Sequence, residues 1–188
     1  MASILLTPPS VEPLSLAEAK AFLRLETADD DALIAAFISA ARLYVETQTG
    51  LALVTQSWRM VLDCWPANGR IAVRPAPLQA LVAARVFDFD GEARAIDIQA
   101  FAPDASMSTL SFLPWALPMP TRIAAGIELD IAVGFGDATS DVPEPIRQAI
   151  RILTAHWHEN RAIVAGGEVA PVPSNAAALI APYRMLPL

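Results

Sequence analysis

The chain has 188 residues, a formal net charge of −7 and a mean hydropathy of +0.41. Lys20 is the only lysine, and the composition therefore excludes a general phosphate- or nucleic-acid-binding protein, which needs clustered basic side chains. Charged residues make up 18% of the chain, below the roughly 25% that is usual. This shortage favours burial of surface between subunits, and an alanine-rich composition is the alternative explanation.

Two helices are predicted in the N-terminal third. Ser15 and Glu18 have the spacing of a capping box, which predicts a short helix that ends near Arg24. A longer helix is predicted over Asp29–Thr49, and Gly50 follows it as the expected C-terminal cap.

The outward side of the longer helix is short of charged residues. Ala36 and Ala40 lie on this side, and their small side chains would let a helix of another subunit come close. We therefore expect Ala36 and Ala40 at an interface between subunits. An alanine surface without a partner is the alternative.

From Leu53 to Val133 the pattern changes to that of strands. Segments rich in β-branched and aromatic residues are separated by proline and glycine turns, which predicts an antiparallel β-rich module. The predicted strands are Val54–Leu62, Ile71–Val73, Leu81–Phe89, Ala95–Phe101 and Ile127–Val133. The Asp90-Gly91 pair is the strongest hairpin signal in the chain.

Residues Pro103–Pro120 are predicted to form a loop. Trp115 lies in it, either as an exposed anchor for a partner or as part of the local core. Earlier in the module, Cys64 and Trp65 are both predicted to be buried.

The last long helix is predicted over residues 141–163. Asp141 is the expected N-cap, with Glu144 three residues later as in a capping box. Arg147, Arg151 and His158 lie away from its apolar stripe, and we expect them to contact an acidic surface of a partner rather than to support folding.

The tail after this helix is rich in proline and short of charge. Its apolar side chains need a surface to cover them, which predicts that residues 166–188 dock on another protein. Leu179, Tyr183 and Arg184 are the candidate contact residues, and a short helical turn is expected at Asn175–Ile180.

No catalytic, cofactor or metal site is predicted. His156 and His158 point about 200° apart on a helix, so they cannot hold one ion together, and no third ligand completes a site. The Gly134–Gly136 pair lacks the third glycine of a dinucleotide-binding motif. No apolar stretch approaches the length of a membrane span, and the start lacks the features of a signal peptide, so we expect synthesis in the bacterial cytoplasm.

An ordered set of segments is similar to a known family. The sequence resembles the head–tail connector proteins of long-tailed phages and related gene transfer agents, which are also called adaptor or head-completion proteins. The matching segments, in chain order, are SLAEAKAFLRL, DDDALIAAFISAARLYVETQTG, LVTQSWRMVLDCWP, IAVRPAPLQAL, VGFGD, the Asp141-Val142-Pro143 start, IRQAI, HWHENR and APYR.

The resemblance implies an α+β fold in which a small helical bundle, built from residues 15–50 and 141–163, carries a β-rich insert at about residues 53–133. One connector domain over residues 1–165 and a docking tail at 166–188 would then form a subunit of a dodecameric ring. This ring would lie beneath the portal protein, contact the next neck or tail component, and let DNA pass without specific binding. The alternatives are another neck or tail protein, such as a tail terminator, and a small ligand-binding or enzymatic domain.

Overall fold

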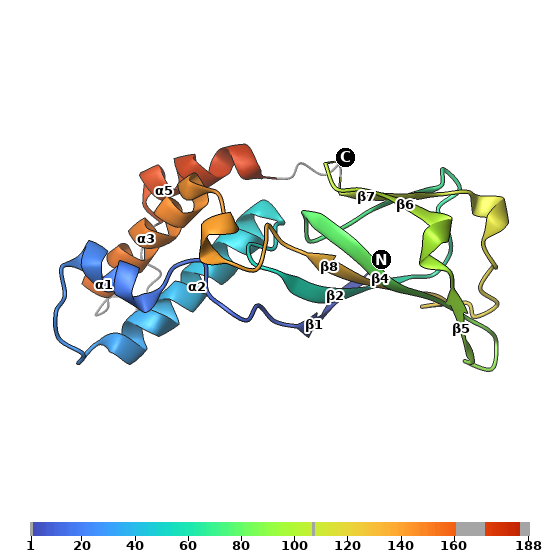
Figure 1. The fold of residues 1–188 in the computed structure, drawn as a ribbon, viewed down its shortest axis with the longest axis horizontal. Coiled ribbons are helices and arrows are strands. Elements are labelled where there is room, and N and C mark those ends of the chain that lie inside the picture. Colours follow the sequence, from blue (N-terminus) through green and yellow to red (C-terminus); the bar gives the residue numbers. More distant parts are fainter. Residues whose placement is uncertain (1, 107, 161–171, 185–188) are drawn as a thin grey trace. The chain divides into compact units, whose positions relative to one another are not determined.

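The chain folds as two units that alternate along the sequence. In the computed structural model, which describes residues 2–106, 108–160 and 172–184, the β unit comprises Met1–Ser10 and Thr55–Phe135. The helical unit comprises Val11–Val54 and Gly136–Leu188. Figure 1 shows helices in the one and antiparallel sheets in the other, which confirms the predicted α+β class.

The β unit is built on a five-stranded antiparallel sheet. Its strands, in their order across the sheet, are β1 (Ala2–Thr7), β2 (Gln56–Leu62), β8 (Ile127–Val133), β4 (Leu78–Phe87) and β5 (Ala93–Ile96). The alternating residues Ile127, Leu129, Ile131 and Val133 are fully buried, as the period of a half-buried strand requires. The central strand β8 therefore supplies one side of the core.

A second sheet lies over one face of the first (Figure 1). Its strands, in order, are β3 (Arg70–Ala72), β7 (Thr109–Phe112) and β6 (Phe101–Asp104). Trp65, Phe101 and Phe112 form an aromatic cluster in this unit, with ring centroids 5.3–5.8 Å apart. The Trp65 indole N–H donates to the carbonyl oxygen of Pro118 at 2.9 Å, so its polar end is satisfied inside the unit.

The helical unit contains α1 (Leu16–Leu23), α2 (Asp31–Thr49), α3 (Glu144–Glu159) and α5 (Ser174–Ile180). Helix α3 packs against α1, α2 and α5. The buried side chains come from the apolar stripes of the two longest helices: Ile34, Ile38, Ala41 and Val45 of α2, and Ile146, Ala149, Ile150 and Leu153 of α3.

Two predicted helix ends are confirmed. The Ser15 hydroxyl accepts from the backbone N–H of Glu18 at 3.2 Å, and the Glu18 carboxylate accepts from the backbone N–H of Ser15 at 3.0 Å. This is the reciprocal capping box. Gly50 ends α2 with φ of 74°, a left-handed conformation that favours glycine.

The predicted start of the last helix is wrong. Helix α3 begins at Glu144, after Pro143, and Asp141 belongs to a short 3-10 turn instead. The Asp141 carboxylate accepts from the backbone N–H of Ala138 at 2.9 Å, so it caps that turn. Residues 161–163 of the predicted helix lie outside the described residues.

The β-rich module differs from the prediction in three places. Strand β1 was not predicted, and Pro103–Pro120 is not a continuous loop, because it contains β7, the end of β6 and a 3-10 turn at Pro114–Ala116. Cys64 is exposed, not buried, because its neighbour Trp65 takes the core position.

Part of the predicted tail is folded onto its own chain. The expected helical turn is confirmed as α5, whose Ala176 and Ile180 are 1% and 0% exposed and which packs on α3. Residues 166–171 and 185–188 of the predicted docking tail lie outside the described residues. The described portion of the tail therefore contributes to the core of the helical unit.

Replacing Ile180 with Ala should lower the free energy of unfolding by about 2–5 kcal/mol, since it leaves a cavity in a fully buried site. Urea denaturation measures this loss. The Ser174→Ala variant is the control, because Ser174 is exposed on the same short helix. An Ile180→Ala protein as stable as wild type would mean that α5 does not hold the helical unit together.

Candidate interaction surfaces

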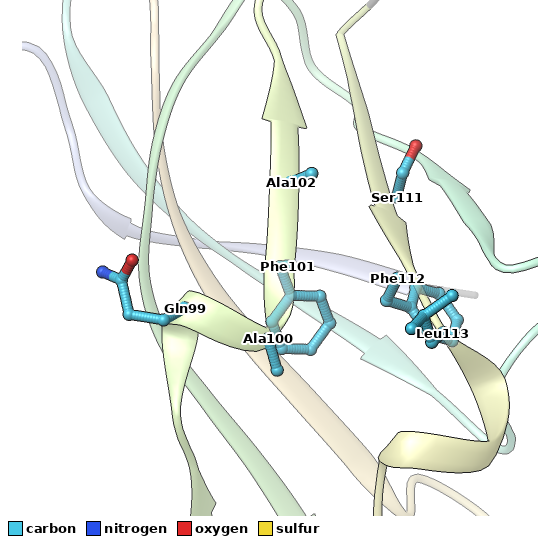
Figure 2. A pocket seen from close by; sticks show the side chains of 7 residues that line it. All are labelled: Gln99, Ala100, Phe101, Ala102, Ser111, Phe112 and Leu113. Carbon is cyan, nitrogen blue, oxygen red and sulfur yellow. The ribbon is translucent and has the colours of Figure 1, made fainter.

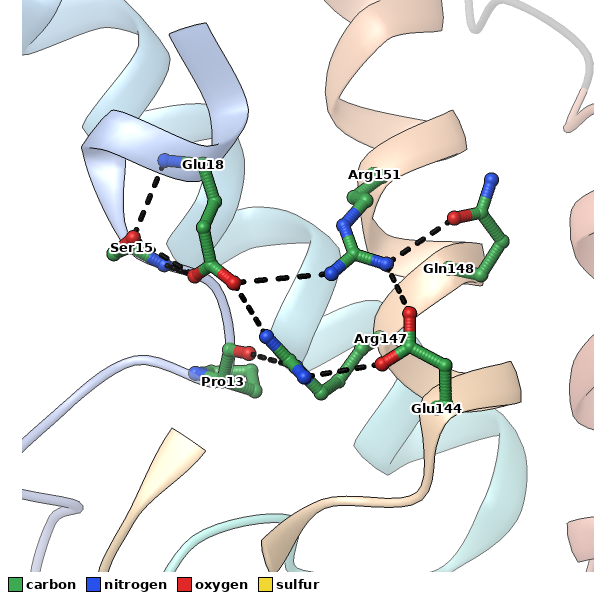
Figure 3. A network of polar contacts seen from close by, with 7 residues as sticks. All are labelled: Pro13, Ser15, Glu18, Glu144, Arg147, Gln148 and Arg151. Carbon is green, nitrogen blue, oxygen red and sulfur yellow. Dashed lines mark hydrogen bonds and ion pairs between the residues drawn. The ribbon is translucent and has the colours of Figure 1, made fainter. Parts of the chain in front are cut away.

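The charged face of α3 lies against α1 (Figure 3). Arg147 Nη2 is 2.5 Å from Glu18 Oε1, Arg147 Nη1 is 3.0 Å from Glu144 Oε2, and Arg147 Nε donates to the carbonyl oxygen of Pro13 at 3.3 Å. Only 14% of the Arg147 side chain is exposed. One guanidinium thus joins the N-terminal segment, α1 and α3.

Arg151 extends this arrangement by one helical turn. Its Nη1 donates to Glu144 Oε1 and, at 3.2 Å, to the side-chain oxygen of Gln148, while its Nη2 lies 3.8 Å from Glu18 Oε1. We call the four residues Glu18, Glu144, Arg147 and Arg151 the arginine clamp. It contains two positive and two negative charges, so it is balanced without any other molecule.

The pKa of each carboxyl group in the clamp lies below the ordinary value of 4.5. For Glu18 the main cause is the hydrogen bond from the Ser15 backbone; burial opposes it, and the Ser15 hydroxyl and the two arginines add to it. For Glu144 the main cause of the lowered pKa is the hydrogen bond from Arg151. Both groups are therefore more stable as carboxylates in the folded protein than in the unfolded chain.

The third predicted contact residue also has a partner in the chain. His158 Nε2 lies 3.0 Å from Asp30 Oδ2, and 14% of the His158 side chain is exposed. Nearby, Trp157 packs against Phe37 and Tyr44 of α2, with ring centroids 6.5 and 6.4 Å away. The structure thus places Arg147, Arg151 and His158 between helices of one subunit, where each has a polar partner within the chain.

The outward side of α2 is exposed and uncharged, as the sequence suggests. Ala36 and Ala40 are exposed on it, together with Leu43, which is 54% exposed. Arg42, on the same helix, forms ion pairs with Glu12 and Glu46, both at 2.8 Å. This face therefore presents small and apolar side chains to its surroundings.

The β unit has its own exposed apolar side chains. Trp115 is 81% exposed, so the alternative that it packs in a local core is excluded. Met119 and Ile123, which the sequence analysis did not single out, are 65% and 93% exposed in the same segment. Hydrogen bonds from Thr121 and Arg122 to the Phe87 carbonyl oxygen hold this segment against the sheet.

The candidate residues of the tail lie at the surface of the helical unit. Leu179 and Tyr183 are half-buried, and Arg184 is exposed, with its Nη2 3.4 Å from the side-chain oxygen of Gln48 on α2. Their contact with another protein stays a prediction.

The pocket at the second sheet gives little support for a small-molecule site. A pocket of about 280 Å³ is lined by residues of β6 and β7 and the turn before β6 (Figure 2). Its polar side chains are Gln99 and Ser111, which Figure 2 shows on different sides of the Phe101 and Phe112 rings. Polar groups that converge on one ligand, the usual mark of a binding site, are missing from this wall.

Within the described residues, no three His, Cys, Asp or Glu side chains are grouped so that they could hold a metal ion. In the same part of the chain, no helix has both the length and the apolar character needed to cross a membrane.

The family comparison agrees with the resemblance. Residues 13–92 match the family described as phage gp6-like head-tail connector protein. Over these residues the chain is similar to the phage head–tail connector family. No curated protein matches this sequence.

Three solved structures match the chain over its whole length. Each match covers 100% of this chain and 97% of the other chain, at 26% sequence identity. They are the neck of an empty gene transfer agent particle computed with C6 symmetry (TM-score 0.80), the virion of a native gene transfer agent particle (0.82), and the neck of a native particle computed with C12 symmetry (0.81).

The arginine clamp leads to a stability prediction for the protein. Arg147→Glu should lower the free energy of unfolding by on the order of 1–3 kcal/mol, because it removes charge-assisted hydrogen bonds and brings a third carboxylate next to Glu18 and Glu144. Arg70→Glu is the matched control, since Arg70 is exposed in the β unit. Unchanged stability combined with failed assembly would instead favour the partner contact expected from sequence.

The lowered pKa values give the pH dependence of this stabilisation. A carboxylate whose folded pKa is depressed contributes its full stabilisation above the unfolded pKa, and the contribution is lost as the pH falls through the folded pKa. Glu18→Gln should therefore destabilise the protein at pH 7, and the difference from wild type should shrink as the pH is lowered from 4.5. Denaturation at a series of pH values tests this, and a difference that grew on acidification would contradict it.

Proposed function

We propose that this protein is a structural adaptor that forms a ring in the neck of a phage-like gene-transfer particle. The observation that carries the proposal is the similarity, over essentially the full length of both chains, to chains of gene transfer agent particles, two of them in neck structures computed with rotational symmetry. The connector family assigns the same structural role. No catalytic role is needed to explain this fold.

We extend the proposal to the copy number of the ring and to its neighbours. We infer twelve copies, because the native neck was computed with C12 symmetry, and the test of this number is the mass of the isolated ring. The ring would lie beneath the portal protein, complete the head and extend the DNA channel towards the next neck or tail component. A net charge of −7 suits a channel wall along which DNA moves without binding.

The structure suggests how such a subunit assembles. The arginine clamp and the apolar helix core hold the helical unit in one shape, and the outward face of α2 is free of charge and available for a neighbour. The two units, over residues 1–165, would act as one connector domain. Leu179, Tyr183 and Arg184 would contact the portal or an adjacent subunit, together with the parts of the tail that lie outside the described residues.

The main alternative within the same particle is a tail terminator. The connector family match and the resemblance to neck chains favour the adaptor, and the position of the protein in labelled particles distinguishes the two. A gold label at the head-proximal end of the neck supports the adaptor, whereas a label at the end of the tail tube identifies a terminator.

Replacing Ala36 and Ala40 together with Glu should prevent ring formation, because two carboxylates would be buried without partners in a close helix contact. Both positions are exposed in the single chain, so circular dichroism and the melting temperature should stay near those of wild type. Native mass spectrometry and particle yield report assembly.

The matched control is Ala21→Glu, which places a carboxylate on an exposed position of α1, outside the α2 face and the tail. It should assemble normally, because neither proposed contact includes Ala21. Full assembly of the Ala36→Glu, Ala40→Glu protein would show that this face is free in the ring.

A further inference from the structure

An apolar groove of about 370 Å³ lies beside the exposed face of α2 in the helical unit. Its apolar wall is formed by Val11, Leu14, Leu16, Ala35 and Ile38. Val11 is 41% exposed, although a valine at the start of a folded unit would normally gain from burial. The sequence analysis did not find this groove, because its residues come from three separate segments.

The polar side chains of the groove are already occupied. Ser39 donates to Glu12 at 2.8 Å, and Glu12 also accepts from Arg42 at 2.8 Å. Ser15 donates to Glu18 at 2.8 Å as part of the capping box. Three of the four polar residues that line the groove are thus paired within the chain, and the groove fits an apolar side chain better than a polar ligand.

A suitable apolar side chain projects from the other side of α1. Phe22 is 45% exposed. It is six positions from Leu16, which places the two side chains about 120° apart around the helix, on either side of the buried Ala19. Each subunit therefore carries a projecting aromatic ring on one side of α1 and an apolar groove on the other.

This arrangement has the form that a cyclic ring needs. Copies related by rotation contact one another through two different surfaces of the subunit, whereas a twofold dimer uses one surface twice. The matched necks, computed with C12 and C6 symmetry, are assemblies related by rotation.

We propose that Phe22 of one subunit inserts into the Val11–Leu16–Ala35 groove of the next subunit in the ring. This inference rests on the proposed ring and deepens it, because it names the two surfaces that meet. Ala35 lines the groove and lies on α2 next to Ala36, so the groove contact continues onto the uncharged face of α2. An aromatic side chain that fills an apolar pocket at the centre of a patch is the usual form of an interface anchor.

Disulfide cross-linking tests this pairing in assembled particles. In a Cys64→Ser background, which removes the only native cysteine, the Phe22→Cys, Ala35→Cys double variant should give a ladder of covalent multimers under mild oxidation. Each single variant should stay monomeric on a non-reducing gel. Dimers from Phe22→Cys alone would indicate a twofold contact and overturn the proposal.

Charge substitutions provide a second, independent measurement. Phe22→Glu should lower ring formation at least tenfold while leaving circular dichroism unchanged, since the side chain is partly exposed in the single subunit. Ala21→Glu is the matched control, because Ala21 is exposed on the same helix but points away from Phe22 and the groove. It should assemble as wild type does.

The two proposals fail in different ways. If wild-type protein is found in the neck ring, but the double cysteine variant gives no ladder and Phe22→Glu assembles normally, the anchor is wrong and the adaptor role stands. If wild-type protein is absent from the neck, the adaptor role itself is overturned, and the anchor is overturned with it.

Discussion

The helical unit depends on the packing of α3 against α1 and α2, from which it is separated by a long stretch of sequence. Helix α2 ends at Thr49 and α3 begins at Glu144, and Thr55–Phe135 of the β unit lie between them in the sequence. Bringing such distant segments together has an entropic cost that grows slowly with the length of the intervening chain. That cost is lowered when the inserted segment folds on its own, and the buried cluster of β8 with the Trp65 aromatic group gives the β unit a core of its own.

The contact between α3 and the first two helices combines two kinds of interaction. The apolar stripe Ile146–Leu153 supplies most of the stabilisation, since burial of each large aliphatic side chain is worth about 1.5–3 kcal/mol. The arginine clamp contributes less to the free energy of unfolding, but it fixes the position of α3 along α1. Arg147 does this by binding Pro13, Glu18 and Glu144 at the same time. A one-turn slip of α3 would keep many apolar contacts and break all of these polar ones.

Short-range sequence patterns predicted helix ends and strands, but they could not predict which distant strands pair with each other. The Ser15–Glu18 capping box, the Gly50 end of α2 and the β8 strand each depend on a few neighbouring residues, and all three were found. Strand β1 was missed because its six residues are all exposed, so they lack the alternation that marks a half-buried strand, and its partner β2 lies about fifty residues away in the sequence.

The candidate interaction surfaces could likewise be predicted only where they depend on one helix. The exposure of Ala36 and Ala40 could be predicted because the face of one helix follows from its period, and their contact with another subunit stays a prediction. The intrachain ion pairs of Arg147 and Arg151 with Glu18 could not be predicted, because Glu18 comes from a distant part of the chain. The groove that receives the proposed anchor depends on three segments and could only be found in three dimensions.

The distribution of charge decides what kind of interface the helical unit can offer. Arg42, Arg147 and Arg151 are all held in ion pairs within the subunit. The exposed face of α2 therefore presents alanine and leucine side chains, and the wall of the neighbouring groove is mostly apolar. An interface built from such residues is held by apolar burial, which salt does not screen, whereas contacts between exposed charges weaken with ionic strength. The proposed ring would admit DNA with its dense cloud of counterions, and apolar contacts between its subunits would be insensitive to these ions.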